Sequence, residues 1–181
     1  MRRKLLITEL NRKSVEEYKK SAKRPLIIVL DNVRSQHNIG SVFRSADAFA
    51  VEKILLCGIS ATPPSAEIHK AALGAEESVD WEYCQDSATI ISRLKKDGYT
   101  ILSVEQTENS TPLNDFSPEK GEKYAIVFGH EIRGVSQQVV DMSDAVIEIP
   151  QFGTKHSLNV SVAVGVVLWE ICKIMDSSTL Y

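Results

Sequence analysis

The chain has 181 residues, of which 43% are hydrophobic and 25% charged; these proportions indicate a globular protein with a sizeable core and exclude a disordered chain. The formal net charge of −3 argues against a protein that binds nucleic acid through its overall charge. Three scattered cysteines and four histidines show no C-x-x-C or H-x-x-x-H spacing. They predict no disulfide framework, and we expect no bound metal.

The apolar runs are too short for a secretory signal or a membrane span. The N-terminus passes from Arg2, Arg3 and Lys4 into a very short apolar run, and the run from Val162 to Trp169 is too short to cross a bilayer. The cysteine usage suits a reducing compartment. The sequence therefore predicts a soluble, cytoplasmic protein that has no membrane partner.

Charge is unevenly distributed along the chain. Residues 1–25 hold nine Lys/Arg and three Asp/Glu, whereas the remainder holds 12 basic and 21 acidic side chains. A basic arm on an acidic body fits a segment that contacts a polyanion, and the alternative is a solvated tail. Ser14 and Glu17 read as a capping box, which predicts a short helix from Val15 to about Lys23. We therefore expect a basic arm at 1–24 and a single domain at 25–181.

Predicted strands and helices alternate along the rest of the chain. Apolar runs of strand length predict strands at 26–30, 53–57, 99–104, 124–128 and 145–149, with a short edge strand at 78–84. Helices are predicted at 40–50, 66–73, 87–96, 136–140 and from 157 to about 173, with a surface loop at 105–123. The alternation predicts an α/β fold whose sheet is largely parallel and flanked by helices.

The last predicted helix has no polar face over most of its length. We expect Ser157 to cap it, and its apolar residues, Val160, Val162, Ala163, Val164, Val166, Val167, Leu168, Trp169, Ile171 and Ile174, cover every side. A helix of this kind must be buried all round. One side can lie on the sheet, and we expect the other to pack against a second subunit.

Three polar segments, 31–44, 129–136 and 151–159, each follow a predicted strand and precede a predicted helix. In α/β sheets ligands bind at the carboxyl ends of the strands, so we expect the segments to converge. They offer the side chains Asn38, Arg44, Glu131, Arg133, Ser157 and Asn159.

Each of these side chains also has an ordinary structural role open to it. Asn38 and Ser157 could be helix N-caps, and Arg44 could pair at a helix surface. Glu131 and Arg133 could form a surface ion pair of little energetic value. The chain has no G-x-G-x-x-G, G-x-x-x-x-G-K-[ST] or G-x-S-x-G motif. Ordinary dinucleotide, nucleoside-triphosphate and hydrolase sites therefore have no support.

Three stretches of the sequence carry a family resemblance. They are HNIGSVFRSADAF at 37–49, IVFGHEIRGVS at 126–136, and IEIP followed by SLNVSVA within 149–163. In order and spacing they resemble the three motifs of the SpoU/TrmH-type RNA 2′-O-ribose methyltransferases of the SPOUT superfamily, and the resemblance covers about residues 25–175. The second motif usually reads Gly-Asn-Glu-Gly-Arg-Gly, so His130 and Ile132 depart from it, with an effect that the sequence leaves open.

The resemblance implies an α/β domain with a C-terminal trefoil knot, a homodimer and S-adenosyl-L-methionine as the cofactor. The implied reaction is methyl transfer to a ribose 2′-hydroxyl of tRNA or rRNA. The first motif resembles that of the guanosine-modifying branches of the family, which implies a guanosine as the target. An alternative is a non-catalytic RNA-binding relative that keeps the fold. The implied cofactor contacts are Val104, Glu105, Gly129, Ile149 and Leu158.

The resemblance also assigns roles to the polar side chains. The implied catalytic set is Arg44, Asn38, Glu131, Ser157 and Asn159, and the expected RNA contacts are Arg44, Arg133, Lys155, Arg12 and Lys19. In the family the arginine that matches Arg44 is proposed to be the base. A guanidinium is almost always protonated, so we assign Arg44 to phosphate binding and to stabilising the developing alkoxide.

Overall fold

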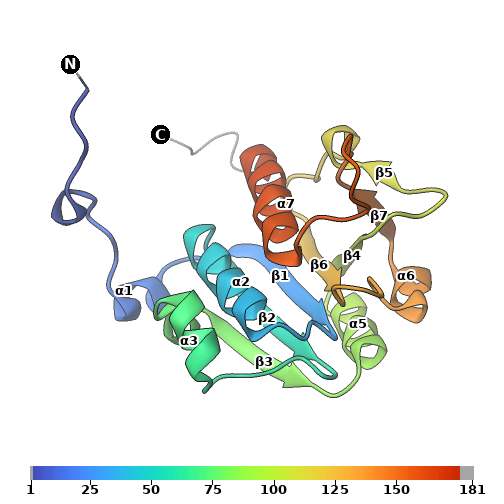
Figure 1. The fold of residues 1–181 in the computed structure, drawn as a ribbon, viewed down its shortest axis with the longest axis horizontal. Coiled ribbons are helices and arrows are strands. Elements are labelled where there is room, and N and C mark those ends of the chain that lie inside the picture. Colours follow the sequence, from blue (N-terminus) through green and yellow to red (C-terminus); the bar gives the residue numbers. More distant parts are fainter. Residues whose placement is uncertain (1, 176–181) are drawn as a thin grey trace.

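A single sheet of seven strands forms the centre of the molecule (Figure 1), which is described here from a computed structural model over residues 2–175. The strand order is β3-β2-β1-β6-β4-β7-β5, and all neighbouring strands pair in parallel. The strands are β1 (Arg24–Asp31), β2 (Val51–Cys57), β3 (Asp80–Cys84), β4 (Tyr99–Val104), β5 (Thr111–Pro112), β6 (Lys123–Gly129) and β7 (Ala145–Glu148).

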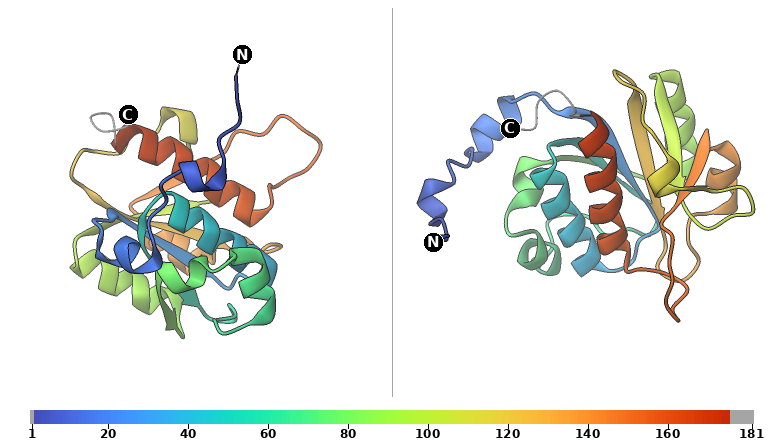
Figure 2. Two further views of the ribbon diagram at one scale, coloured as in Figure 1. Left: turned by 90° about the vertical axis from the view of Figure 1, so that its left-hand side faces the viewer. Right: turned by 90° about the horizontal axis from the view of Figure 1, so that it is seen from above.

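Helices cover both faces of this sheet. Seen from above in Figure 2, α2, α3 and α7 lie on one face, and α5 and α6 lie on the other. The helices are α1 (Val15–Lys20), α2 (Gln36–Ala48), α3 (Ala66–Ala72), α4 (Ala75–Ser78), α5 (Ser87–Lys96), α6 (Gln137–Met142) and α7 (Val160–Met175), with 3-10 turns at η1 (Ile7–Glu9) and η2 (Leu113–Asp115). The predicted parallel α/β architecture is therefore confirmed.

The central strand β1 shows why its apolar run is continuous. Ile28 and Leu30 are buried in the core under α2 and α7, whereas Ile27 and Val29 point to the opposite core under α5 and α6. Successive strand residues face opposite sides of a sheet. A strand that is covered on both faces therefore needs apolar residues at every position.

The register of the strands brings their carboxyl ends to one edge. Asp31 at the end of β1 lies opposite Gly129 at the end of β6. Val104 at the end of β4 lies opposite Ile147 in β7. The loops that follow these strands therefore start close together, as expected for a parallel sheet.

Helix α2 begins earlier than predicted. It starts at Gln36 and not at Gly40, and its N-cap is Ser35, whose Oγ accepts a hydrogen bond from the backbone N–H of Asn38 at 3.2 Å. Asn38 is therefore neither a loop residue nor an N-cap: it lies in the first turn of the helix and is buried. The β-region backbone of Ser35 is the usual geometry of an N-cap serine.

Helix α7 begins later than predicted, at Val160 and not at Ser157. Asn159 caps it instead, because its backbone carbonyl accepts the N–H of Ala163 at 2.9 Å and its Oδ1 accepts the N–H of Ser161 at 2.8 Å. The expectation that Ser157 caps this helix is wrong, since it precedes the helix by three residues within the loop.

The apolar helix α7 has two unlike faces. Its inner face packs into the core beside α2 through Val160, Val164, Val167, Leu168, Ile171 and Cys172. Its outer face leaves Val162, Val166 and Trp169 exposed by 51%, 39% and 61%. Within one chain the helix is therefore not buried on every side.

The segment predicted as a surface loop contains two short elements, β5 and η2, and β5 adds an outermost strand beside β7. The predicted edge strand is also shorter than expected, because residues 75–78 form the small helix α4 and β3 starts at Asp80. None of the helices in residues 2–175 is long and apolar enough to cross a membrane.

The N-terminal arm extends away from the body (Figures 1 and 2). Its capping box is confirmed: Ser14 Oγ accepts the Glu17 N–H at 3.2 Å, and Glu17 Oε2 accepts the Ser14 N–H at 2.8 Å. Helix α1 ends at Lys20, and Tyr18 is buried in the main core. Tyr18 thus attaches α1 to the body. Residues 176–181 of the expected domain lie outside the described residues.

Candidate functional site

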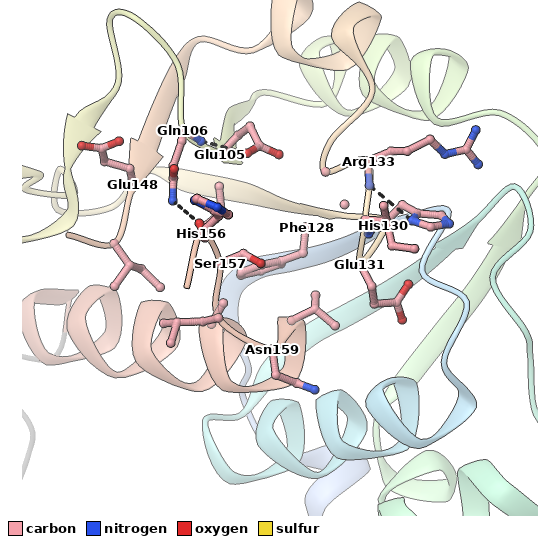
Figure 3. A pocket seen from close by; sticks show the side chains of 18 of the residues that line it. Glu105, Gln106, Phe128, His130, Glu131, Arg133, Glu148, His156, Ser157 and Asn159 are labelled. Atoms are coloured by element: carbon pink, nitrogen blue, oxygen red, sulfur yellow. Dashed lines mark hydrogen bonds between the residues drawn. The ribbon is translucent and has the colours of Figure 1, made fainter. Parts of the chain in front are cut away.

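A cavity of about 500 Å³ opens at the carboxyl edge of the sheet (Figure 3). The ends of β4, β6 and β7 form its floor, and the loop that leads into α7 forms one wall. Its volume and its mixture of apolar and polar lining are typical of sites for small molecules. It is lined by all five residues expected to bind the cofactor, Val104, Glu105, Gly129, Ile149 and Leu158.

Two glycines let the second polar segment fold tightly against the floor of the cavity. A Cβ on Gly129 would lie 2.0 Å from the carbonyl carbon of Gly134. Gly134 has a φ of +68°, and a Cβ there would lie 2.0 Å from Oε2 of Glu105. Both positions therefore require glycine, one for close backbone approach and the other also for its left-handed backbone.

Glu105 connects this segment to the end of β4. Its Oε2 accepts the backbone N–H of Val135 at 2.9 Å, and its Oε1 accepts the N–H of Gln106 at 2.9 Å. The side chain of Gln106 in turn donates to the carbonyl of His156 at 2.9 Å. Three cavity-lining segments that are far apart in the sequence are thus held at fixed spacing.

Glu131 holds the N-terminus of α2. Its carboxylate accepts the backbone N–H groups of Arg34 at 3.1 Å and Ser35 at 2.9 Å, and the side-chain amide of Asn38 at 3.2 Å. Burial alone would raise the pKa of Glu131, but hydrogen bonds from Ser35, its own backbone, Arg34 and Asn38 together lower the pKa below its ordinary value. Glu131 is therefore ionised and bound at neutral pH, and it makes no ion pair with Arg133 among the described residues.

Asn38 extends this network to the third polar segment. Its Oδ1 accepts the side-chain amide of Asn159 at 3.0 Å. Asn159 Oδ1 then accepts the N–H and hydroxyl of Ser161 at 2.8 and 2.7 Å. One chain of hydrogen bonds thus joins Glu131, Asn38 and Asn159. In Figure 3, Glu131 and Asn159 both point toward α2.

The remaining predicted residues differ in their distance from the cavity. Ser157 and Arg133 line it, although the Arg133 side chain extends away from its centre in Figure 3. Arg44 does not line it: it is exposed on α2, and its side chain makes no hydrogen bond or ion pair to residues 2–175. Lys155 is exposed in the loop before α7 and does not line the cavity either. Arg12 and Lys19 are exposed on the arm.

A match to a known family covers these elements. The model of the SpoU rRNA Methylase family matches residues 25–169. The chain belongs to the SpoU rRNA methylase family. This membership confirms the resemblance carried by the three motifs, and all three lie within the matched residues.

Individual SpoU relatives have named activities. RlmB of Neisseria meningitidis, a 23S rRNA (guanosine-2′-O-)-methyltransferase, is 32% identical over 146 residues, 81% of this chain and 57% of that protein. The tRNA (guanosine(18)-2′-O)-methyltransferase of Aquifex aeolicus is 28% identical over 177 residues, 97% of this chain and 82% of that protein. The chain spans about three fifths of the length of the first curated relatives that it matches.

A solved methyltransferase structure shows the same fold. The AdoMet-bound rRNA methyltransferase from Sinorhizobium meliloti superimposes with a TM-score of 0.78 over 91% of this chain and 61% of that chain, at 23% identity. At this identity the likeness concerns the fold alone. It agrees with the parallel sheet and flanking helices described above.

Sequence reasoning about the SpoU motifs gave no role to three residues that shape the cavity: Gln106, His130 and His156. Gln106 and His156 act through one hydrogen bond between a side chain and a backbone carbonyl, which leaves no spacing signal in a sequence. His130 was visible only as a departure from the second motif. His130 is only 7% exposed, and this burial depends on the tertiary fold.

The described residues hold one group of side chains with metal-ligand spacing, His69, Glu76 and Glu77. It lies on α3 and α4, and none of the three lines the candidate cavity. The cavity thus offers no comparable group of ligands in residues 2–175, and the expected absence of a metal stays a prediction.

Proposed function

We propose that the protein transfers a methyl group from S-adenosyl-L-methionine to a ribose 2′-hydroxyl of tRNA or rRNA. The observation that carries this proposal is the hydrogen-bond chain Glu131–Asn38–Asn159, which joins the three family motifs at one cavity. Both named relatives above modify a guanosine. We therefore propose a guanosine as the target nucleotide.

The cavity fits the proposed cofactor. Val104, Ile149 and Leu158 offer apolar walls to an adenine ring, and Glu105 and Gln106 offer polar groups to a ribose or an amino-acid moiety. A volume of about 500 Å³ lies in the range for ligands of this size. When bound, S-adenosyl-L-methionine supplies an electrophilic methyl group.

The chain's own residues would then position the acceptor hydroxyl and favour its loss of a proton. Glu131 is a poor candidate for the base because its oxygens already accept three hydrogen bonds and its pKa is lowered. Ser157 and Asn159 border the cavity, where they would shape the ribose pocket. Arg44 would bind an RNA phosphate and stabilise the developing alkoxide.

The RNA would be bound by basic residues around and beyond the cavity. Arg133 and Lys155 border or flank it, and Arg44 lies exposed on the helix that the network holds. Arg12 and Lys19 on the extended arm would add contacts to the phosphate backbone. In this proposal the arm at 1–24 serves the RNA, and residues 25–181 form the methyltransferase domain.

The exposed apolar face of α7 supports a homodimer. Val162, Val166 and Trp169 lie on one side of the helix, with α2 beside it. Aromatic and aliphatic residues of this kind are enriched at the core of subunit interfaces. We further propose, from the family resemblance, that the C-terminal part of the domain is tied in a trefoil knot and that the protein acts in the cytoplasm.

The test is methyl transfer by the purified full chain with radiolabelled S-adenosyl-L-methionine and transcripts of tRNA and rRNA. We expect label in RNA, at a 2′-O-methylguanosine after nuclease digestion and mass spectrometry. Cofactor binding without transfer to any cellular RNA would contradict the proposed activity. Failure to bind the cofactor in calorimetry, with RNA binding retained, would establish the non-catalytic relative instead.

A further inference from the structure

Residues 130–134 form a closed loop on the floor of the cavity. The backbone N–H of His130 donates to the carbonyl of Gly134 at 3.0 Å, and the N–H of Gly134 donates back to His130 at 2.8 Å. The imidazole of His130 folds into this loop, and the residue as a whole is 7% exposed. Its Nδ1 lies 3.0 Å from the N–H nitrogen of Ile132 and 3.4 Å from that of Arg133, as the dashed lines in Figure 3 indicate.

These contacts define the protonation of the ring. Both neighbours are backbone N–H donors, so Nδ1 must present its lone pair to them. A neutral imidazole with an unprotonated Nδ1 carries its proton on Nε2. The loop is therefore built around one tautomer of a neutral histidine.

Both ends of the loop connect to the rest of the site. Glu131, the residue after His130, reaches α2 and binds the N–H groups of Arg34 and Ser35. At the other end, Val135 donates to Glu105 beneath the cavity. The shape of the loop therefore decides whether the carboxylates of Glu131 and Glu105 can form these hydrogen bonds at the same time.

We infer that His130, as the neutral Nε2–H tautomer, is the positioning residue that holds loop 130–134 in the shape that binds the cofactor. The inference rests on the proposed function only for the identity of that cofactor. His130 acts through the backbone of its own loop and needs no contact with the ligand. A proton added at Nδ1 would put a donor against two donors, and the loop would lose its internal acceptor.

Other charged groups face the same loop. Glu131 and Arg133 lie on the loop itself, and Glu105, the residue after β4, packs against it. Asp31 at the end of β1 accepts the N–H of Ser136 just beyond it, at 2.8 Å.

Further titratable groups lie on the neighbouring segments. His156 lines the cavity, and Arg34 and His37 lie at the N-terminal end of α2, which Glu131 holds. A comparison of proteins that keep His37 and His156 and differ at position 130 therefore isolates the contribution of His130.

Substitutions at His130 can distinguish its role as a hydrogen-bond acceptor from its role in filling space. The change His130→Asn keeps a side-chain acceptor, because the amide oxygen lies the same number of bonds from Cα as Nδ1 does, and the amide does not titrate. The change His130→Leu keeps apolar bulk and removes the acceptor. His69→Asn on α3 is the matched control, because His69 lies outside the cavity.

The experiment measures the affinity of S-adenosyl-L-methionine by calorimetry at pH 8 for the wild type and these three variants. We expect His130→Leu to bind about tenfold more weakly, since two donors lose their acceptor. His130→Asn should match the wild type, because it restores that acceptor. His69→Asn should follow the wild type.

Two results would overturn the inference: wild-type affinity in His130→Leu, or an affinity of His130→Asn that is as weak as that of His130→Leu. A ligand-free measurement separates this failure from failure of the proposed function. Nitrogen-15 NMR of the His130 ring at pH 8 should show a protonated Nε2 and an unprotonated Nδ1. Hydrogen exchange at Ile132 and Arg133 should be slow in the wild type and in His130→Asn, and faster in His130→Leu. If the wild type binds no cofactor, these two readouts still decide the role of His130.

Discussion

The two sides of the candidate site differ in how far their side chains are already bound within the chain. On the cavity side, Glu131, Asn38 and Asn159 hold one another and the N-termini of two helices. On the outer side, Arg44 is exposed on α2, and Trp169 is exposed on α7. The first side is preorganised, and the second leaves its side chains exposed to solvent.

This difference predicts that substitutions on the two sides affect separate steps. The residues of a preorganised network lose little conformational entropy on binding. They should therefore govern the shape of the cavity and the stability of the fold. Groups that are not bound within the chain contribute only when a partner arrives. They should govern methyl transfer, subunit association and RNA affinity.

The largest effect is expected at Arg44. Arg44→Ala should lower the rate of methyl transfer by roughly 100- to 1,000-fold, the usual loss when one charge-stabilising donor is removed. The affinity for S-adenosyl-L-methionine should stay within about twofold, because Arg44 does not line the cavity. Single-turnover kinetics and calorimetry measure the two quantities. Lys70→Ala, which removes an exposed positive charge from α3, is the control, and an active Arg44→Ala protein would refute the assignment.

Subunit association should show the next largest effect. Trp169→Glu places a charge on the exposed face of α7, and we expect the dimer dissociation constant to rise by at least about 30-fold, as for a buried aromatic anchor. Analytical ultracentrifugation measures this change. Ile59→Glu changes a similarly exposed apolar residue outside α7 and should leave association unchanged. A wild-type sedimentation profile for Trp169→Glu would exclude this face as the interface.

The network itself should respond at the level of stability. Glu131→Gln should lower the free energy of unfolding by about 0.5–1 kcal/mol at pH 7. A charged acceptor is lost while its donors remain, and solvent screens part of the effect because Glu131 is exposed. Glu67→Gln on α3, where the carboxylate is exposed, should have almost no effect. Urea titrations measure both differences. Equal stability of Glu131→Gln and wild type would show that the carboxylate is not needed to hold α2.

The same pair of proteins makes a pH test with a definite sign. The pKa of Glu131 is lowered in the folded state, so its contribution to stability is present above the pKa of the unfolded chain. The difference between wild type and Glu131→Gln should therefore be constant above about pH 5 and shrink as the pH falls below about 4. A difference that grew on acidification would contradict the lowered pKa.

The smallest effect is expected on the arm. Lys19→Glu should weaken RNA binding a few-fold and reduce the slope of log affinity against log salt by about one, as for the loss of one phosphate contact. Filter binding at several salt concentrations measures both. The matched charge reversal is Lys96→Glu on α5, which covers the face of the sheet opposite to α2, α3 and α7. If the two variants gave equal slopes, the arm would be a solvated tail that does not contact RNA.

Much of the fold was predictable because its signals are local. The apolar run of β1 marks a strand covered on both faces, and the capping box of Ser14 and Glu17 marks the start of α1. Helix starts were less certain where several polar residues compete for the cap. Ser35 and Asn159 cap the helices that were expected to begin near Gly40 and at Ser157, and the choice among them depends on tertiary partners.

The candidate site was predictable in its location and less so in its connections. The ends of parallel strands had to bring the three polar segments together, and the cavity lies there. That Glu131 binds backbone N–H groups of α2, and that Asn38 faces Asn159, could not be read from spacing. Each such pair depends on side-chain orientation after the sheet has formed.

The hydrogen bonds of the network also have a consequence for the order of events in synthesis and folding. Asn38 is bound to Glu131 and Asn159, which follow it by 93 and 121 residues along the chain. Contacts so distant in sequence are slow to form and must wait for most of the polypeptide to be made. A nascent chain that ends between β7 and Asn159 contains all seven strands yet has no closed network. Translation products truncated there thus lack part of the network, however much of their sheet is folded.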